Sequence, residues 1–127
     1  MDDDSLRLTL ETSDSFVDGW ILTNTTKQRE AKSPFPMDQG GVSGMPLQKI
    51  SLEVLKKSVN MLGAQKKNKI LVSVGGILDA QDISQRLNEG ADLVQTYSGL
   101  VFQGPLFFQN SLQALRSPKV WNYGSMA

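Results

Sequence analysis

The stretch KILVSVGGILDAQDISQRLNEGADLVQTYSG, residues 69–99, indicates the fold class of this chain more clearly than any other part of the sequence. It opens with an apolar run at 69–76 that ends in two glycines, and it closes with a second run at 91–99. Between them, LDAQDISQRLNEG predicts a helix with Asp79 as its N-cap and Gly90 as its stop. Apolar strands joined through a helix are typical of parallel strand pairing in α/β proteins.

The same alternation extends toward the N-terminus. VDGWILT at 17–23 indicates another buried strand, and SLEVLKKSVNML at 51–62 indicates an amphipathic helix. Ser51 is the expected N-cap of this helix and Gly63 its expected stop. The apolar positions expected on one face of the helix are Leu52, Leu55, Val59 and Leu62.

Three further segments complete the order of elements. DSLRLTLETSDSF at 4–16 predicts a short helix capped by Asp4 or Ser5. Residues 27–50 predict a polar loop, and a loop of this length is usually functional or disordered. GPLFFQNSLQALRS at 104–117 predicts a last helix with Pro105 in its first turn.

The resulting order, β-α-β-α-β-α, predicts a parallel sheet covered by helices. Either a doubly wound sheet or part of a (β/α)8 barrel fits this order. The chain has 127 residues, whereas a complete barrel takes ~250. Three strands with helices on one side leave two open edges and an uncovered face. We therefore expect residues 1–127 to be a single partial domain, a fragment or a protomer that needs a partner, with an irregular tail at 118–127.

Composition excludes several classes of function. Thirteen basic residues balance thirteen acidic ones, so there is no electrostatic footprint for nucleic acid or an anionic membrane surface. The sequence has no cysteine and no histidine, which excludes disulfides, zinc–thiolate sites and a Ser-His-Asp triad within the chain. No apolar run is long enough to cross a bilayer, and the acidic N-terminus does not resemble a signal peptide. The chain itself is expected to be soluble.

Polar and small residues follow each predicted strand. They are Thr23, Asn24 and Thr25 after the first, Gly75 and Gly76 after the second, and Tyr97, Ser98 and Gly99 after the third. Parallel strands end at one rim, where α/β proteins bind ligands. Glycine lets backbone N–H groups approach a phosphate, and a following helix adds partial positive charge. Taken singly, each group also fits an ordinary turn, cap or core aromatic; together they predict a ligand that bears a phosphate.

Three segments resemble the C-terminal part of dihydroorotate dehydrogenase in its membrane-associated, quinone-using class. They are DGWILTNTT at 18–26, GGVSGMPLQKIS at 40–51 and VSVGGILDAQDISQRLNEGADLVQTYSGLVFQGP at 72–105. The segments occur in the family's order, and the tyrosine at position 97 favours the quinone class over the soluble class. The similarity extends from about Asp18 to about Leu115.

The resemblance implies a (β/α)8 barrel that binds FMN at its C-terminal rim. Such an enzyme oxidises dihydroorotate to orotate in pyrimidine synthesis and passes electrons to ubiquinone or menaquinone. It associates peripherally with the mitochondrial inner membrane or the bacterial cytoplasmic membrane. This chain would supply about strands six to eight with their helices, and the remainder of the barrel or another protomer would close the fold.

The resemblance also assigns roles to individual residues. Substrate contacts fall on Asn24 and Thr25. Flavin contacts fall on Thr23, Ser43 and Gly44. Contacts to the FMN phosphate fall on Gly75, Gly76, Tyr97 and Ser98. A tunnel toward the quinone would pass Tyr97, Val101 and Pro105.

No catalytic residue is expected in this chain, and no metal site. The family's deprotonating serine and its flavin-contacting lysine belong to the first half of the barrel, so this chain alone is expected to be inactive. Two alternatives stay open. One is another phosphate-binding barrel enzyme, such as an isomerase or synthase of a phosphorylated compound. The other is a truncated remnant without catalytic function.

Overall fold

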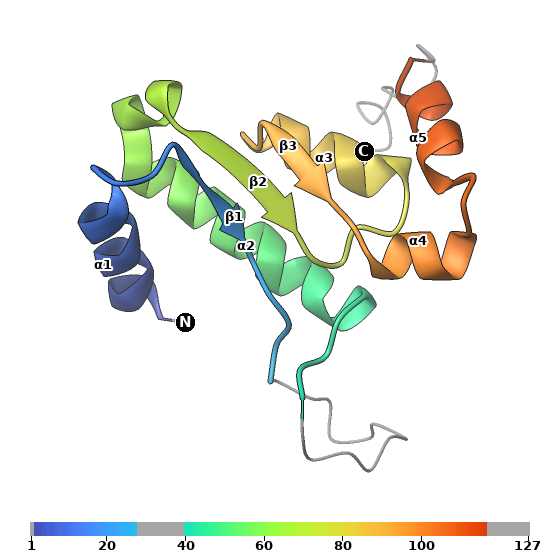
Figure 1. Cartoon of the computed structure of the whole chain (residues 1–127), viewed down its shortest axis with the longest axis horizontal. Helices are drawn as coiled ribbons and strands as arrows, with labels where there is room; N and C mark the ends of the chain where they lie inside the picture. Colours follow the sequence, from blue (N-terminus) through green and yellow to red (C-terminus); the bar gives the residue numbers. More distant parts are fainter. Residues whose placement is uncertain (1, 28–39, 117–127) are drawn as a thin grey trace, which may run out of the picture.

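A computed structural model describes residues 2–27 and 40–116. Three strands form one sheet in the order β1-β2-β3, and both pairings are parallel, as the sequence predicted (Figure 1). The strands are β1 (Gly19–Leu22), β2 (Ile70–Val74) and β3 (Leu93–Gln95). The helices are α1 (Asp3–Ser13), α2 (Met45–Leu62), the 3-10 helix η1 (Gly63–Asn68), α3 (Ala80–Asn88), α4 (Ser98–Gln103) and α5 (Phe107–Arg116). The tail predicted at 118–127 lies outside the described residues.

The strand register brings the three carboxyl ends to one edge of the sheet. Leu22, the last residue of β1, pairs with Ser73 of β2. Val74, the last residue of β2, pairs with Gln95, the last residue of β3. Because the strands are parallel and end at nearly the same level, the segments that follow them meet at a common rim.

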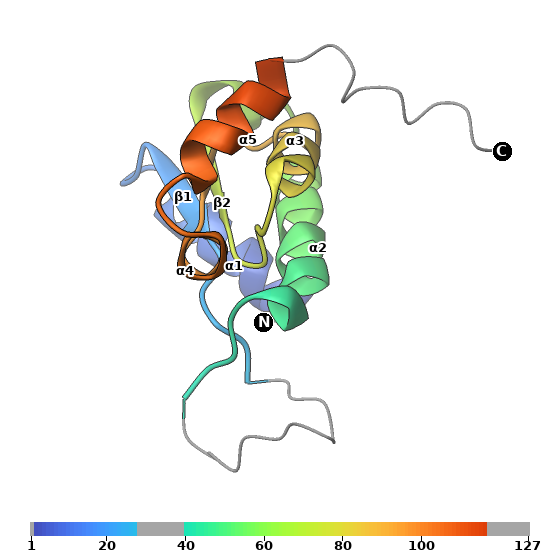
Figure 2. The same ribbon diagram turned by 90° about the vertical axis from the view of Figure 1, so that its right-hand side faces the viewer.

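Helices α2 and α3 lie on the same side of the sheet (Figure 2). One core cluster fills the space between the sheet, α1 and α2; its buried members are Leu6, Leu10, Trp20, Leu55, Leu62, Leu71 and Ala91. A second cluster joins the turn after β2 to α3 and α5; its buried members are Ile77, Ile83 and Phe107. Through Ile77, this second cluster packs against the turn that follows β2 at the rim.

The opposite face of the sheet carries exposed apolar side chains. Ile21 is 67% exposed, Leu93 58% and Ile70 49%. Ile21 pairs with Val72, which pairs with Leu93, so an apolar row crosses all three strands. Side chains alternate between the faces of a strand, and this set points away from α2 and α3. The uncovered face predicted from the three-stranded arrangement is therefore present in the described part of the chain.

Helix α1 forms where a short helix was predicted, but the prediction that Asp4 or Ser5 is its N-cap was wrong. Asp2 is the N-cap, and its carboxylate accepts a hydrogen bond from Ser5 N at 2.8 Å. That backbone N–H lowers the pKa of Asp2. The first backbone N–H groups of a helix have no partner within the helix. A carboxylate on the residue just before the first turn can accept from one of them, as Asp2 does here.

Helix α2 begins at Met45, so the prediction that it starts after Ser51 was wrong. Pro46 stands in its first turn, a position where the missing N–H is not needed. Gly63 ends the helix as predicted. The buried residues of the helix are Leu47, Ser51, Leu55, Ser58 and Leu62. Leu52 and Val59, which were predicted on the buried face, are only half-buried. The buried face of the longer helix instead begins at Leu47 and includes Ser51 and Ser58.

The last predicted strand and helix also differ from the structure. Asp79 caps α3 as predicted, with its carboxylate accepting from Gln81 N and Asp82 N at 2.9 Å. The strand predicted at 91–99 is confined to β3, and its end belongs to the short helix α4. Pro105 precedes the last helix instead of occupying its first turn, because Gly104, at φ +78°, separates α4 from α5.

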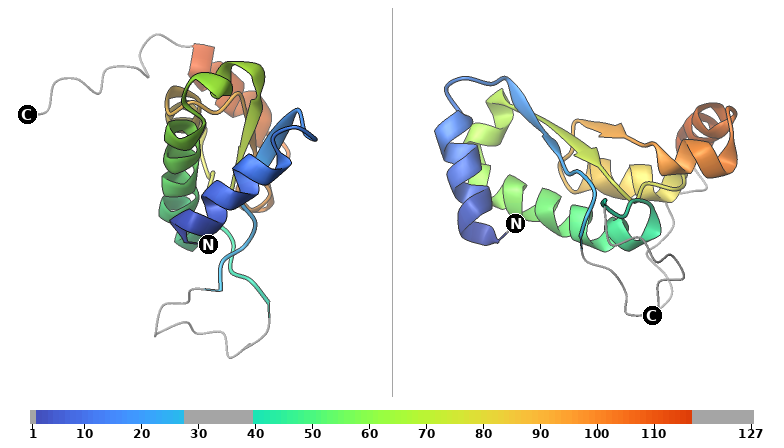
Figure 3. Two further views of the ribbon diagram at one scale, coloured as in Figure 1. Left: turned by 90° about the vertical axis from the view of Figure 1, so that its left-hand side faces the viewer. Right: turned by 60° about the horizontal axis from the view of Figure 1, so that its bottom comes forward.

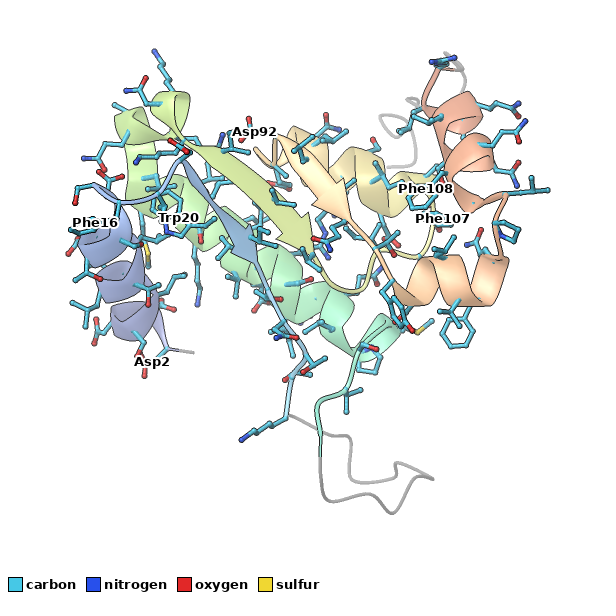
Figure 4. All side chains as sticks on the ribbon, viewed as in Figure 1. Asp2, Phe16, Trp20, Asp92, Phe107 and Phe108 are labelled. Carbon is cyan, nitrogen blue, oxygen red and sulfur yellow. The ribbon has the colours of Figure 1, made fainter. Side chains whose placement is uncertain are left out.

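Asp92, just before β3, ties that strand to its neighbours (Figure 4). Its Oδ2 accepts hydrogen bonds from Lys66 Nζ at 2.6 Å and from Leu71 N at 2.8 Å. Burial raises the pKa of Asp92, but these two donors outweigh burial, and the net effect is a lowered pKa. The ionised carboxylate is therefore favoured in the folded state.

Replacing Asp92 with asparagine is expected to destabilise the fold by about 1 kcal/mol at pH 7, a modest loss because the pair is partly exposed. A carboxyl group whose pKa is lowered on folding stabilises above its unfolded pKa of 3.8. That contribution disappears as the pH falls through the lower, folded pKa. Urea denaturation of the unmodified chain and the variant across this pH range measures the difference. Lys66→Met removes the partner of the same pair and is expected to show the same pH dependence. A difference that persists unchanged at low pH contradicts the assignment.

Candidate functional site

A cavity of about 340 Å³ opens at the rim where the strands end. Its lining includes every residue to which the sequence assigned a cofactor or substrate contact: Thr23, Asn24, Thr25, Ser43, Gly44, Gly75, Gly76, Tyr97 and Ser98. Leu47, Val74, Ile77 and Thr96 complete the lining. The volume is within the range of small-molecule sites, ~300–1,000 Å³.

The segment after β1 is fixed at Thr23 and more open beyond it. Thr23 donates twice to Val74 O, from its N at 3.1 Å and from its Oγ1 at 3.3 Å. The peptide bond between Leu22 and Thr23 is cis. The Asn24 Oδ1 accepts from Thr25 N at 2.7 Å, which leaves the two side-chain N–H groups of Asn24 as donors. Asn24 and Thr25 are both exposed.

The segment that leads into α2 runs beside the segment that follows β1 (Figure 3, right). Thr26 and Val42 form an antiparallel bridge with N–O distances of 3.0 and 2.7 Å. A Cβ atom added to Gly41 would lie 1.8 Å from Thr25 Oγ1, so only glycine permits this approach. Ser43 Oγ lies 3.1 Å from Ser98 Oγ and links this segment to the start of α4.

The two glycines after β2 form a turn that only glycine adopts easily. Gly75 has φ +106° and Gly76 has φ +66°. A Cβ atom on Gly76 would lie 2.2 Å from the Cα of Gln48. The turn therefore packs directly on the first turns of α2, whose N-cap, Gly44, lines the same cavity. The N-terminus of a long helix adds partial positive charge to this part of the rim.

The segment after β3 is joined to the glycine turn. Thr96 Oγ1 donates to Ile77 O at 2.7 Å. Tyr97 is 77% exposed and Ser98 is half-buried. Two residues of the predicted quinone tunnel, Val101 and Pro105, are exposed and are not part of the cavity lining. Of the tunnel residues, the structure places only Tyr97 at the cavity.

The cavity can bind and orient a ligand, but its own groups are poorly suited to acid–base chemistry. Among the described residues that line it, there is no carboxylate, lysine or arginine. Within residues 2–27 and 40–116, no group of three potential metal ligands gathers. Across the same residues, no helix is long and apolar enough to pass through a membrane. An anion here would be held by backbone N–H groups, hydroxyls and the start of α2.

The sequence analysis gave no site role to four lining residues: Leu47, Val74, Ile77 and Thr96. Thr96 directly precedes the Tyr-Ser pair, and its position at a strand exit was a signal that could have identified it. Leu47 was assigned to a loop because α2 was predicted to start too late. Placing Leu47 on a helix requires continuing the apolar stripe backward from Leu55, through Ser51, with a spacing of four residues.

Comparisons of the sequence with known proteins point to one family. The profile of the dihydroorotate dehydrogenase family matches residues 5–118. The dihydroorotate dehydrogenase (quinone) of Delftia acidovorans is 38% identical over 101 residues, which are 78% of this chain and 28% of that protein. The protein of the same name from Kineococcus radiotolerans is 45% identical over 94 residues, which are 70% of this chain and 25% of that protein.

Solved structures show the same correspondence in three dimensions. The crystal structure of DHODH from Eimeria tenella in complex with ferulenol superposes with a TM-score of 0.79 at 27% identity, covering 89% of this chain and 30% of that one. The ligand-free form from the same organism gives a TM-score of 0.79 at 26% identity and covers 91% and 32%. The chain thus spans about a quarter of the length of the curated relatives it matches. This chain belongs to the dihydroorotate dehydrogenase family, and its sequence matches the quinone-dependent members.

Proposed function

We propose that this chain forms one wall of the FMN and orotate sites of a quinone-dependent dihydroorotate dehydrogenase, as the C-terminal part of its barrel. The observation that carries the proposal is the convergence of all three strand exits on one cavity. The complete protein would oxidise dihydroorotate to orotate in pyrimidine synthesis, with ubiquinone or menaquinone as acceptor, at a membrane surface. The relatives named for this activity support the assignment.

The turn after β2 and the segment after β3 would hold the FMN phosphate. Gly75 and Gly76 let the turn pack closely on α2, because a Cβ on either would collide with that helix. Tyr97 and Ser98 bring hydroxyl groups from the neighbouring exit. A site built from neutral donors and a helix N-terminus suits a phosphate, because backbone N–H groups and the partial positive charge of the helix attract the anion without a charged side chain.

The flavin ring would lie against Thr23, Ser43 and Gly44. Thr23 uses its hydroxyl proton on Val74 O, so its oxygen presents an acceptor to a ligand N–H. The Ser43–Ser98 contact fixes the segment before α2 relative to the phosphate half of the site. Bound FMN would accept the hydride equivalent released when dihydroorotate is oxidised.

The substrate would be oriented by Asn24 and Thr25. Orotate carries amide N–H and C=O groups and a carboxylate, and an asparagine amide with two available donors complements its oxygens. Holding a planar substrate in the reactive geometry against its reaction partner lowers the entropic cost of a bimolecular step, which is a large part of its activation free energy. Since the part of the lining that the structure describes has no carboxylate, lysine or histidine, the base that removes the substrate proton would come from the rest of the protein. Catalysis by this chain alone is not expected.

Binding to the full chain tests the proposal without requiring turnover. Amide NMR spectra would be recorded during titration with FMN and, separately, with riboflavin, which lacks the phosphate. FMN is expected to bind at least about tenfold more tightly, because charge-assisted hydrogen bonds to the phosphate are lost with riboflavin. The largest shifts are expected at Gly75, Gly76 and Ser98. Equal affinities, or shifts spread away from the cavity, would overturn the assignment.

Asn24→Ala tests the substrate half separately. In the presence of FMN, orotate is expected to bind the variant roughly tenfold more weakly, through the loss of donors to a charged or polar ligand. FMN affinity itself should not change. Asn60→Ala, an exposed asparagine on α2, is the matched control and should leave both affinities intact. If the two variants behave alike toward orotate, Asn24 has no role in substrate binding.

A further inference from the structure

Arg86, on α3, lies buried beneath the glycine turn. Its side chain is 1% exposed. The guanidinium donates to Gly75 O at 3.1 Å, to Gln48 O at 2.8 Å and to Ser73 Oγ at 3.2 Å. One arginine thus connects β2, the start of α2 and the turn that the sequence assigned to phosphate. Sequence analysis gave Arg86 no role.

A second donor acts on the same carbonyl. Ser51 Oγ, on α2, donates to Gly75 O at 2.7 Å. Both donors belong to the helices behind the sheet, so the Gly75 carbonyl points toward the helices. In a trans peptide the N–H of the next residue points opposite to the carbonyl. The Gly76 N–H is therefore turned away from the helices, and it has no hydrogen-bond acceptor among the described residues.

The charge of Arg86 is only partly neutralised. No carboxylate in the described parts of the chain forms an ion pair with its guanidinium. The carboxylate of Asp82 is instead hydrogen-bonded to Leu78 N at 2.8 Å and to Gln48 Nε2 at 2.5 Å. Burial lowers the pKa of Arg86, and the charge of Asp82 opposes that effect. The Arg86 Nε is buried without a partner.

A buried cation without an ion pair is costly unless an anion compensates it. The cavity on the other side of Gly75 is the place where such an anion would lie, because Gly75 both accepts from Arg86 and lines the cavity. A phosphate held by the Gly76 N–H would receive attraction from Arg86 through the turn, without direct contact. The low polarity around Arg86 would make that attraction stronger than at a solvated site.

We infer that Arg86 is a positioning residue for phosphate: together with Ser51 it fixes the Gly75 carbonyl so that the Gly76 N–H faces the ligand, and its buried charge favours a dianionic group there. This inference rests on the proposed FMN site. The competing view is that Arg86 is only a clamp, a residue whose hydrogen bonds hold α2, α3 and β2 together without any effect on the ligand. A clamp affects stability and the binding of any ligand equally, whereas a phosphate-positioning residue affects FMN more than riboflavin.

Two serines of α2 provide a matched test. Ser51 and Ser58 are both 0% exposed, and each hydroxyl lies within hydrogen-bond distance of a carbonyl of its own helix, at 3.1 and 2.8 Å. The single Ser51 proton makes its shorter contact with Gly75 O, at 2.7 Å. Only Ser51 donates to Gly75 O. Ser51→Ala is expected to reduce the preference for FMN over riboflavin by several-fold, about the effect of one hydrogen bond. Ser58→Ala should leave that preference unchanged even if it lowers stability.

Arg86 itself is tested by Arg86→Met and Arg86→Lys. The methionine variant keeps an unbranched side chain and removes the charge, so its FMN preference is expected to fall by about tenfold or more. The lysine variant should retain part of the preference, because it keeps the positive charge without the planar donor geometry. If Arg86→Met does not fold, the lysine variant and the serine pair still decide the question.

The outcomes separate the two levels of the proposal. An unmodified chain that binds FMN and riboflavin with equal affinity shows that the phosphate site itself is wrong. An unmodified chain that prefers FMN, with Ser51→Ala and the Arg86 variants showing the same preference, shows that the site is right and Arg86 is only a clamp. A loss of preference in Ser51→Ala and Arg86→Lys or Arg86→Met, but not in Ser58→Ala, supports the inference.

Discussion

Gly76→Ala is expected to lower the free energy of unfolding by more than about 3 kcal/mol, a loss that would unfold much of a marginally stable domain. Two costs add. An alanine at φ +66° costs about 1–2 kcal/mol in backbone strain. Its Cβ would also lie 2.2 Å from Gln48 Cα and 2.4 Å from Gln48 N. Because these are backbone atoms of α2, no side-chain rotation relieves the overlap, and α2 must move away from the turn.

Gly104→Ala is the control for this prediction. Gly104 also has a positive φ, +78°, but an added Cβ there meets nothing within 4 Å. The control therefore carries the conformational cost alone, about 1–2 kcal/mol. Urea denaturation followed by circular dichroism measures both variants. Equal losses would mean that the turn is not packed against α2 as described.

Phe107→Ala has the second large expected effect, a loss of about 3–5 kcal/mol, as for other large-to-small changes of buried aromatic residues. Phe107 is 1% exposed and belongs to the core cluster with Ile77 and Ile83. Ile77 follows the glycine turn directly, so the cavity left by the ring would lie under the part of the rim that Gly75 and Gly76 form. We expect ligand affinity at the rim to fall together with stability.

The neighbouring phenylalanine is the natural control. Phe108 is 51% exposed and meets the Phe107 ring edge to face at a centroid distance of 5.4 Å (Figure 4). Phe108→Ala removes this contact and some partly exposed surface, and its expected cost is about 1 kcal/mol. Thermal unfolding of the two variants should rank them clearly. A Phe108 variant that is as unstable as the Phe107 variant would contradict the burial pattern of α5.

The strand exits show how far a sequence can specify a site. The parallel order of elements, deduced from apolar runs and intervening helical patterns, was enough to bring residues 23–25, 75–76 and 97–98 to one rim, and the structure gathers them around one cavity. This worked because parallel strands joined by right-handed crossovers all end at the same edge. The assigned contacts to flavin, phosphate and orotate remain predictions.

The errors share a physical origin. Ser51 was taken for a helix cap because serine before an apolar stripe usually is one. Its burial against β2 depends on contacts between α2 and the glycine turn, far away in the sequence. The short helix α4 was missed because its apolar residues continue the strand pattern of β3. Local propensity cannot decide between these states when packing against other elements supplies most of the free energy.

The alternation of strands and helices, the common rim and the family could be read from the order of residues, because they depend on periodicity and short motifs along the chain. Three features became visible only in the folded chain: the residue at which α2 begins, the face of the sheet that is left open, and the hydrogen bonds from Arg86 and Ser51 to the Gly75 carbonyl. These features depend on atoms brought together from distant parts of the chain. Hydrogen bonds of this kind depend on distances of a few tenths of an ångström, which no spacing of residues along a sequence encodes.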